Sequence, residues 1–279
     1  MNSPQIVTTV AELRHLLKPW RADGIAMVPT MGALHDGHLS LVEAAKKKTP
    51  HVVVSIFVNP TQFAPHEDFN SYPRTLEADR AKLATVNASV IFAPTAKEMY
   101  PDGFATTLLM KGPAAGLETD FRPHFFDGVA TVVAKLLIAA MPDWAAFGEK
   151  DYQQLLVVQR LVADLALPTQ ILPVAIAREA DGLAMSSRNA YLSPAERIVA
   201  GKLNLVMKDV IAHLKKGMSV AEVQTLGTTA LKAAGFDSVD YLALRDAVTL
   251  APLAQPNAPA RLLAAARIGK TRLIDNMVV

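Results

Sequence analysis

The chain has 279 residues, enough for one large domain or two modest ones. Hydrophobic residues make up 51% and charged residues 19%, which excludes a disordered or acidic-tail protein. The formal net charge of +2 is too small to indicate a nucleic-acid or membrane-surface partner, and the absence of cysteine excludes disulfides, thiolate metal sites and a cysteine nucleophile.

The N-terminal segment has no basic start followed by an apolar core, so it does not read as a signal peptide. Apolar runs such as 136–141 are far shorter than the ~20 residues that span a membrane. These patterns predict a soluble, cytoplasmic protein.

A helix is predicted over 8–19, where apolar residues recur at helical spacing and Pro19 ends the run. Most of the functional prediction rests on the next stretch, MVPTMGALHDGHLSLV over 27–42. Residues 25–28 read as a buried strand, Pro29 and Gly32 as its exit turn, and Asp36 as the N-cap of a helix.

His35 and His38 lie three residues apart at the start of that helix. A strand, a glycine turn and a helix N-terminus form a phosphate-binding geometry, because unpaired N–H groups and the positive end of the helix dipole point at one place. Gly32 and Gly37 have P-loop spacing, but the next residue is His38 where that motif needs Lys. Read alone, the two histidines are equally compatible with capping and loop roles, and they are too few for a zinc site.

A continuous apolar, β-branched run over 51–58 predicts a central parallel strand. Residues 59–63, NPTQF, follow at its carboxyl end, where open α/β sheets bind ligands, although the segment taken alone favours a plain Asn-Pro turn. A helix over 75–84, a strand over 88–92, an irregular Gly- and Pro-rich excursion or lid over 96–121 and a buried helix over 129–140 follow.

A strand over 144–147 runs into Gly148-Glu149-Lys150-Asp151 and a helix over 152–166, which repeats the topology of the first loop. Lys150 is placed to meet phosphate, with a surface ion pair to its acidic neighbours as the alternative. After a strand over 170–176, the exposed cluster 185–189, MSSRN, combines hydroxyl donors with a guanidinium fork suited to phosphate. Helix capping by its serines is the alternative.

Beyond Pro194 the pattern changes to helices over 195–216 and 219–234 and strands over 239–245 and 261–268. That order predicts a small α+β domain. We therefore expect an α/β fold with a Rossmann-like, doubly wound parallel sheet over 1–176 and a smaller C-terminal α+β domain over 177–279.

Five segments in order, PTMGALHDGH, FVNPTQF, FGEKDYQQ, MSSRN and TRLIDN, resemble the pantothenate synthetase family of ATP-dependent ligases. The resemblance runs from Pro29 to Asn276, and the first segment also resembles the HIGH loop of the nucleotidyltransferase superfamily. The family condenses (R)-pantoate with β-alanine through a pantoyl adenylate, with release of pyrophosphate and then AMP. The resemblance implies an ATP- and pantoate-binding first domain, a C-terminal lid domain and a homodimer.

The resemblance also implies site residues. His38 is the expected proton donor, and Gln62 and Gln154 are expected to bind pantoate, with Gln62 shared by β-alanine. The implied ATP-binding residues are Met31, Gly32, Ala33, Leu34, His35, Asp36, Gly37, His38, Gly148, Glu149, Lys150, Asp151, Ala177, Met185, Ser186, Ser187 and Arg188. Mg²⁺ is implied as a cofactor beside the substrate ATP, and Asp79 stands where a magnesium-associated acidic residue is expected, although its neighbour is Ala78.

The chain departs from the family pattern at two places. Relatives commonly read RPGHF where this chain has RPHFF over 122–126, so Phe125 occupies the position of a histidine. His66 stands where asparagine is frequent.

Two other functions fit parts of the pattern. Another nucleotidyltransferase of the superfamily would need a cationic acceptor pocket in place of Gln62 and Gln154. A nucleotide-binding sensor without catalysis would fit better had His38, Lys150 or Arg188 been lost, and all three are present.

Overall fold

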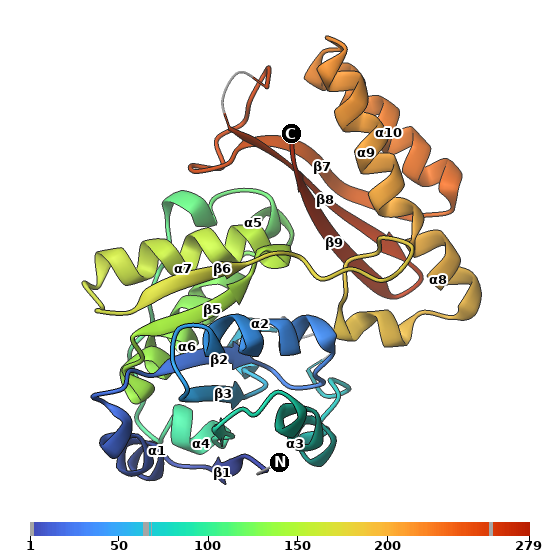
Figure 1. Ribbon diagram of the computed structural model, residues 1–279. Coiled ribbons are helices and arrows are strands. Elements are labelled where there is room, and N and C mark those ends of the chain that lie inside the picture. The colour runs from blue at the N-terminus through green and yellow to red at the C-terminus, as the bar shows by residue number, and fades with distance from the viewer. Residues whose placement is uncertain (1–2, 64–66, 68, 257–258) are drawn as a thin grey trace. The chain divides into compact units, whose positions relative to one another are not determined.

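The computed structural model describes residues 3–63, 67, 69–256 and 259–279, so His66 lies outside the described residues. The chain divides into two compact units (Figure 1). Unit 1 comprises Met1–Glu149 and Gln153–Ala175, and unit 2 comprises Lys150–Tyr152 and Ile176–Val279. The short segment Lys150–Tyr152 therefore groups with the C-terminal unit, which the sequence did not predict.

The first part of the chain alternates strands and helices. The strands are β1 (Gln5–Val7), β2 (Ala26–Thr30), β3 (Val52–Ile56), β4 (Val90–Phe92), β5 (Trp144–Gly148) and β6 (Gln170–Val174). The helices are α1 (Val10–Leu17), α2 (Asp36–Lys46), α3 (Leu76–Thr85), α4 (Ala96–Met99), α5 (Glu118–Phe121), α6 (Phe125–Ala140) and α7 (Tyr152–Asp164).

The six strands form one parallel sheet in the order β1-β4-β3-β2-β5-β6. From β2 the chain adds β3 and β4 on one side and later β5 and β6 on the other, so the order reverses between β2 and β5. Ligands of doubly wound folds bind outside the carboxyl ends of the strands at such a reversal. The predicted α/β fold is confirmed.

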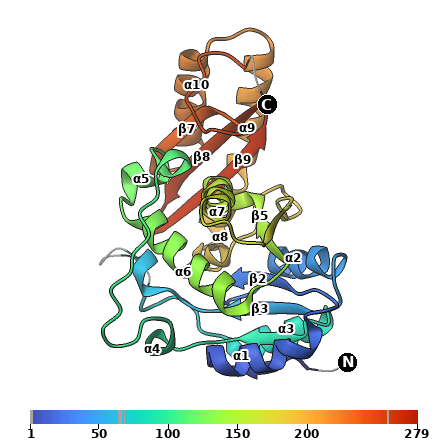
Figure 2. The ribbon, with the colours of Figure 1, turned by 90° about the vertical axis from the view of Figure 1, so that its left-hand side faces the viewer.

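Helices cover both faces of this sheet (Figure 2). On one face Val28, Val54 and Ile91 of the strands pack against Val42 of α2 and Leu83 of α3, all of them buried. The right-handed crossovers of a parallel sheet place α1 and α6, which contact each other, on the opposite face. Because both faces are covered, the strands read in sequence as continuous apolar runs rather than alternating ones.

Unit 2 is an antiparallel sheet with helices on one face. It contains α8 (Pro194–Ala200), α9 (Lys202–Lys215), α10 (Val220–Ala234), β7 (Ser238–Asp246), β8 (Ala260–Ile268) and β9 (Thr271–Val278). The strand order is β7-β8-β9, and a separate core forms where Met207 of α9 and Leu231 of α10 meet Leu262 of β8. Within the described ranges, no helix of either unit has the length and apolar character to span a bilayer.

Several elements differ from the sequence prediction, among them the short helices α4 and α5, which lie within the excursion predicted as irregular. The short β1 and the terminal β9 were not predicted as strands. The helix predicted over 195–216 is two helices that meet at Gly201, whose own φ of −60° is helical. A Cβ on Gly201 would lie 2.3 Å from Asp181 Oδ2, so the residue is small because of a neighbour rather than because of its backbone.

Candidate active site

The loop after β2 is held by one buried carboxylate. Asp79 of α3 is 1% exposed, and its two oxygens accept the backbone N–H groups of Ala33 at 3.0 Å and Leu34 at 2.8 Å. Gly32 and Ala33 have positive φ values of 85° and 51°. A Cβ on Gly32 would lie 3.0 Å from Ile56 and 3.2 Å from the Asp79 carboxylate, so this turn needs glycine for both conformation and space.

The two histidines cap α2. His35, not the predicted Asp36, is the N-cap, because its backbone is extended (φ −133°, ψ 175°) and its Nδ1 accepts the Gly37 N–H at 3.1 Å. Nδ1 of His38 accepts the His35 N–H at 3.3 Å, and the two ring centroids are 4.1 Å apart. Since Nδ1 is the acceptor in both rings, the proton of each neutral imidazole is on Nε2, and that nitrogen is a hydrogen-bond donor.

The ladder between β2 and β5 ends before the loop begins. β5 pairs with β2 only at Ala26 and Met27, whereas β3 pairs along the strand as far as Thr30. Pro29, which has no N–H, is therefore tolerated inside a central strand, because it lies beyond the β5 pairing. The strands separate where the loop over 31–38 leaves the sheet.

The carboxyl ends of three neighbouring strands bring predicted site residues to one edge of the sheet. The loop over 31–38 follows β2, the turn with Gln62 follows β3, and Gly148 ends β5 and is followed by Glu149. Gln154 lies in the first turn of α7, directly after this edge. These residues were expected together, and in unit 1 the topology gathers them as the fold rule predicts.

The turn that carries Gln62 is η2 (Pro60–Gln62), a 3-10 turn capped by Asn59. Asn59 is 1% exposed; its Nδ2 donates to Gly128 O at 3.2 Å, and its Oδ1 accepts the Tyr100 hydroxyl at 2.7 Å. Burial raises the pKa of the Tyr100 phenol, more than its hydrogen bonds to Thr61 and Asn59 lower it. The phenol therefore stays a donor to Asn59 through the neutral range.

α6 packs closely against this turn at Gly128. A Cβ on Gly128 would lie 2.4 Å from the carbonyl oxygen of Thr61, so only glycine allows the helix to approach the turn this closely. Arg122, just before α6, donates to the carbonyl oxygen of Gln62 at 3.1 Å. Neither Gly128 nor Arg122 was predicted from the sequence to support the site.

The two glutamines predicted to bind the acid substrate have unengaged amides. Both Gln62 and Gln154 are partly buried, and neither side chain hydrogen-bonds to another described residue. The neighbouring Gln153, by contrast, is 4% exposed and donates to the carbonyl oxygens of Pro113 and Gly116, both at 3.0 Å. Gln153 thus tethers the excursion, and Gln154 is the glutamine available to a ligand.

The remaining predicted ATP-binding residues belong to unit 2. Ala177 and Met185 are adjacent, because Met185 N–H donates to Ala177 O at 2.9 Å. Ser186 caps the 3-10 turn η5 (Ser187–Tyr191) and accepts the Arg188 N–H at 3.2 Å, so the capping role considered for these serines is present. Ser187 and Arg188 form the first residues of that turn.

Lys150 and Asp151 lie in the short segment that groups with unit 2. The Lys150 Nζ is 3.7 Å from Asp151 Oδ2, and the two side chains are 21% and 46% exposed. The ion pair considered from the sequence therefore exists. Partly exposed pairs of this kind contribute little to stability.

The terminal segment TRLIDN lies in β9 and contacts both parts of the unit 2 site. Asp275, 3% exposed, accepts a bidentate ion pair from Arg178, the residue after Ala177, at 2.7 and 2.8 Å. Asn276, 2% exposed, donates to the backbone oxygen of Lys150 at 2.9 Å. The family resemblance includes this segment, but the sequence predicted no role for its residues, because the contacts join positions about 100 residues apart.

The described side chains do not by themselves complete a Mg²⁺ site. Among them no group of three or more His, Asp or Glu residues is close enough to hold a metal. Asp79, the residue expected to be associated with magnesium, instead uses both oxygens to hold the loop after β2. Its observed role is structural support of the predicted ATP loop.

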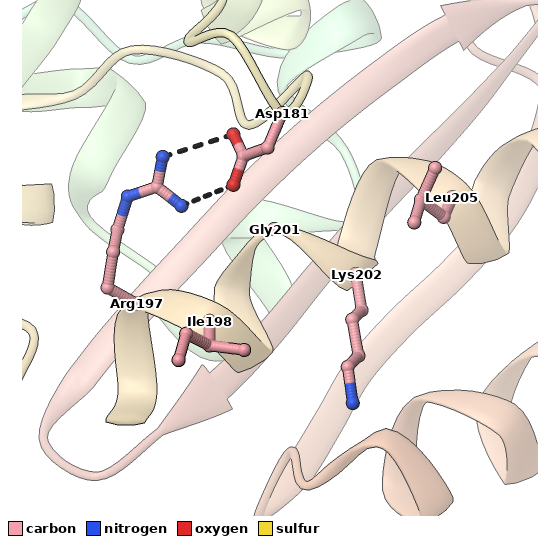
Figure 3. Close-up of a pocket in the computed structure, with 6 residues that line it drawn as sticks. All are labelled: Asp181, Arg197, Ile198, Gly201, Lys202 and Leu205. Carbon is pink, nitrogen blue, oxygen red and sulfur yellow. Dashed lines mark hydrogen bonds and ion pairs between the residues drawn. The ribbon is translucent and has the colours of Figure 1, made fainter. Parts of the chain in front are cut away.

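A cavity of about 300 Å³ in unit 2 is lined by none of the predicted site residues (Figure 3). An ion pair between Asp181 and Arg197 lies on one side of it, and Ile198, Gly201, Lys202 and Leu205 line the rest. None of these is a candidate ligand of ATP or pantoate, so the cavity does not mark the active site.

The chain is similar to known proteins along almost its whole length. The family model described as pantoate-beta-alanine ligase matches residues 5–278. Pantothenate synthetases of Mesorhizobium japonicum and Rhodopseudomonas palustris are each 55% identical to the chain, covering 100% of it and 99% and 100% of their own lengths.

Solved structures agree as well. The pantothenate synthetase of Thermus thermophilus superposes with a TM-score of 0.93 at 49% identity, covering 98% of both chains. The pantoate-beta-alanine ligase of Francisella tularensis, solved in complex with beta-gamma ATP and beta-alanine, gives 0.84 at 34% identity and covers 99% of this chain and 97% of its own. The chain belongs to the pantoate-beta-alanine ligase family.

Proposed function

We propose that this chain is an AMP-forming ligase that condenses (R)-pantoate with β-alanine, using ATP as a substrate. Condensation of pantoate and β-alanine is the reaction of its family. In the first step a pantoate carboxylate oxygen attacks the α-phosphorus of ATP and pyrophosphate leaves. In the second step the β-alanine amine attacks the acyl carbon of pantoyl adenylate, and the acyl–oxygen bond breaks to release AMP.

The observation that carries the proposal is the loop over 31–38 at the sheet reversal. A buried carboxylate fixes its turn, and its two histidines keep Nε2 as the proton-bearing nitrogen at the start of an 11-residue helix. This geometry supports His38 as the donor to the leaving phosphate oxygens, with His35 beside it. Donors fixed before the reaction stabilise developing charge without reorganisation.

Further ATP contacts are assigned to the two other loops. We assign the ATP-binding role to Met31–His38, Gly148–Asp151, Ala177 and Met185–Arg188. Lys150 and Arg188 supply the positive charge that pyrophosphate departure requires, and no covalent nucleophile is needed.

Gln62 and Gln154 are assigned to pantoate, and Gln62 also to β-alanine. Their amides are neutral and not engaged by other described residues. A cation on the pantoate carboxylate would stabilise its charge and weaken its attack, whereas an amide orients it at lower cost. A cytidylyl- or adenylyltransferase acting on a phosphorylated acceptor would need a cationic pocket here instead.

Mg²⁺ is proposed to arrive with the ATP triphosphate. Magnesium sites of nucleotide-dependent enzymes commonly combine substrate phosphates and waters with one or two protein carboxylates, so a full protein cage is not required.

Four further assignments are proposed. The excursion over 96–121, tethered by Gln153, is proposed to shield the adenylate from water, and unit 2 is proposed to act as a lid. We also propose a homodimer, for which the exposed apolar side chains Ile138, Met141 and Leu165 are candidate contacts, and a cytoplasmic location.

Pyrophosphate exchange into ATP tests the function. We expect exchange only when pantoate is present, and none when pantoate is replaced by β-alanine alone. Exchange that ignores pantoate would exclude pantoate adenylation and favour another nucleotidyltransferase. No exchange under any condition, with ATP binding retained, would favour a nucleotide sensor.

A further inference from the structure

Arg122 makes a dense set of contacts beside the turn that carries Gln62. Its Nε and one terminal nitrogen donate to the two Glu67 oxygens at 2.6 and 2.9 Å, and that same terminal nitrogen donates to the Gln62 carbonyl oxygen at 3.1 Å. The Cζ atom of the guanidinium lies over the Phe125 ring, 3.8 Å from its centre. The side chain is only 15% exposed.

These contacts restrain the guanidinium from two sides. Glu67 orients it through a two-point ion pair, and the Phe125 ring lies against it in cation–π contact. The fixed group then offers one N–H to the last residue of the turn. Asn59 accepts the Thr61 and Gln62 N–H groups within the turn, and Arg122 adds a side-chain contact from outside the turn at the residue that carries the amide.

The charge of Arg122 is already compensated. Glu67 takes it in a bidentate pair, and Glu118 lies 3.8 Å from its second terminal nitrogen. A guanidinium paired in this way is poorly suited to bind a substrate carboxylate as well. Its contact with a backbone oxygen favours a role through Gln62 rather than on the substrate.

We propose that Arg122 is a positioning residue that sets the Gln62 amide for the acid substrates, with Phe125 and Glu67 holding the guanidinium in place. The inference rests on the proposed function, because Gln62 is the proposed ligand of pantoate and β-alanine. It assigns Phe125 a structural partner: the ring supports Arg122 at the start of α6.

The test is Arg122→Lys, measured against Arg74→Lys. Lysine keeps the charge but cannot serve Glu67 and the Gln62 oxygen with one fixed fork. Arg74 is a matched control in the same unit, because it also donates to backbone oxygens, of Asn70 and Phe69, and lies over a phenylalanine ring, but its hydrogen bonds to described residues do not include the turn.

In Arg122→Lys we expect KM for pantoate and for β-alanine to rise about tenfold or more, the size of effect that a displaced positioning group produces. KM for ATP should stay within about twofold, and all three should stay within about twofold in Arg74→Lys. Unchanged pantoate and β-alanine KM values would overturn the proposal, as would an equal rise in all three. Phe125→Leu, which keeps the apolar bulk, should shift the same two constants in the same direction and serves if Arg122→Lys does not fold.

A double-mutant cycle separates positioning through Gln62 from a general structural role. In a Gln62→Ala background, Arg122→Lys should change the pantoate KM by less than about twofold, because the group it positions is gone. A rise of the same size in both backgrounds would mean that Arg122 acts independently of Gln62. If wild-type exchange does not require pantoate at all, it is the proposed function that fails, which distinguishes the two failures.

Discussion

His38 is the single side chain on which the proposed chemistry depends most. Its Nδ1 is engaged by the His35 backbone N–H, which directs the ring proton to Nε2. The same hydrogen bond orients the ring against His35. A histidine held in one tautomer at a helix start is suited to donate to a departing phosphate oxygen.

We expect His38→Ala to lower the adenylation rate by ~100-fold or more, as is typical for loss of a positioned transition-state donor. The measurement is pantoate-dependent pyrophosphate exchange at saturating ATP. His15→Ala, at an exposed position of α1, is the matched control and should match the wild type. Near-normal exchange in His38→Ala would mean that the donor is another residue.

Asp79 is the second side chain with a clear consequence. In Asp79→Asn the side chain keeps one acceptor oxygen where the loop presents two N–H donors, and its amide would face one of them. We expect the free energy of unfolding to fall by about 2 kcal/mol, the range for hydrogen bonds to charged groups, and KM for ATP to rise.

Urea unfolding and steady-state kinetics check this expectation against Asp102→Asn, whose side chain is 96% exposed. Asp102→Asn should change neither quantity. Wild-type stability and ATP affinity in Asp79→Asn would show that the loop does not need the carboxylate.

Among the elements, α6 and the η2 turn are coupled by Gly128. Alanine is ordinarily the better helix residue by roughly 0.5–1 kcal/mol, yet here its Cβ would meet a backbone oxygen that cannot rotate away. We expect Gly128→Ala to destabilise the protein by about 1–3 kcal/mol, the range for overpacking, and to raise KM for pantoate.

Gly227→Ala in α10 provides the comparison. Its Cβ would meet the side chains of Leu242 and Val210, so it should also destabilise, but through unit 2 and without changing KM for pantoate. If both variants changed the KM for pantoate equally, the contact between α6 and the η2 turn would have no specific role in substrate binding.

In unit 2, the loop before η5 is tied to α8 by the ion pair of Asp181 and Arg197 (Figure 3). Hydrogen bonding to Arg197 lowers the pKa of Asp181, so the folded state holds its proton less tightly than the unfolded state does. The pair therefore contributes stability above the unfolded pKa of about 3.9, and this contribution is lost as the pH falls through the lower folded pKa.

We expect wild-type protein to lose more stability between pH 6 and pH 3 than Asp181→Asn does, measured by urea unfolding at both pH values. The difference should be small, because the pair is partly exposed. Parallel losses in the two proteins would show that the ion pair does not contribute to acid stability.

For the chain as a whole, the sequence predicted the parallel sheet well because its central strands β2, β3 and β5 are mostly buried. The run over 51–58 is β3, and the helix-strand alternation places β2 and β3 side by side as expected. Two strands were missed for different reasons. β1 has only three residues, and β9 carries the polar residues Asp275 and Asn276, which hide its strand pattern.

The candidate site, too, was predictable only in part. Loops were predictable because they follow strand ends, which local sequence marks. Their supports were not, since Asp79 acts 45 residues from Leu34 and Asn276 acts 126 residues from Lys150. The break at Gly201 was missed for the same reason, because it accommodates Asp181 rather than a backbone turn.

The most direct test of the proposed reaction follows the carboxylate oxygen of pantoate. If pantoate attacks the α-phosphorus of ATP and β-alanine then displaces AMP, the bridging oxygen stays with AMP. Pantoate labelled with ¹⁸O in both carboxylate oxygens should therefore yield AMP with one ¹⁸O per amide formed, read by mass spectrometry. AMP without label, or label in inorganic phosphate together with ADP, would contradict adenylation of pantoate by this chain.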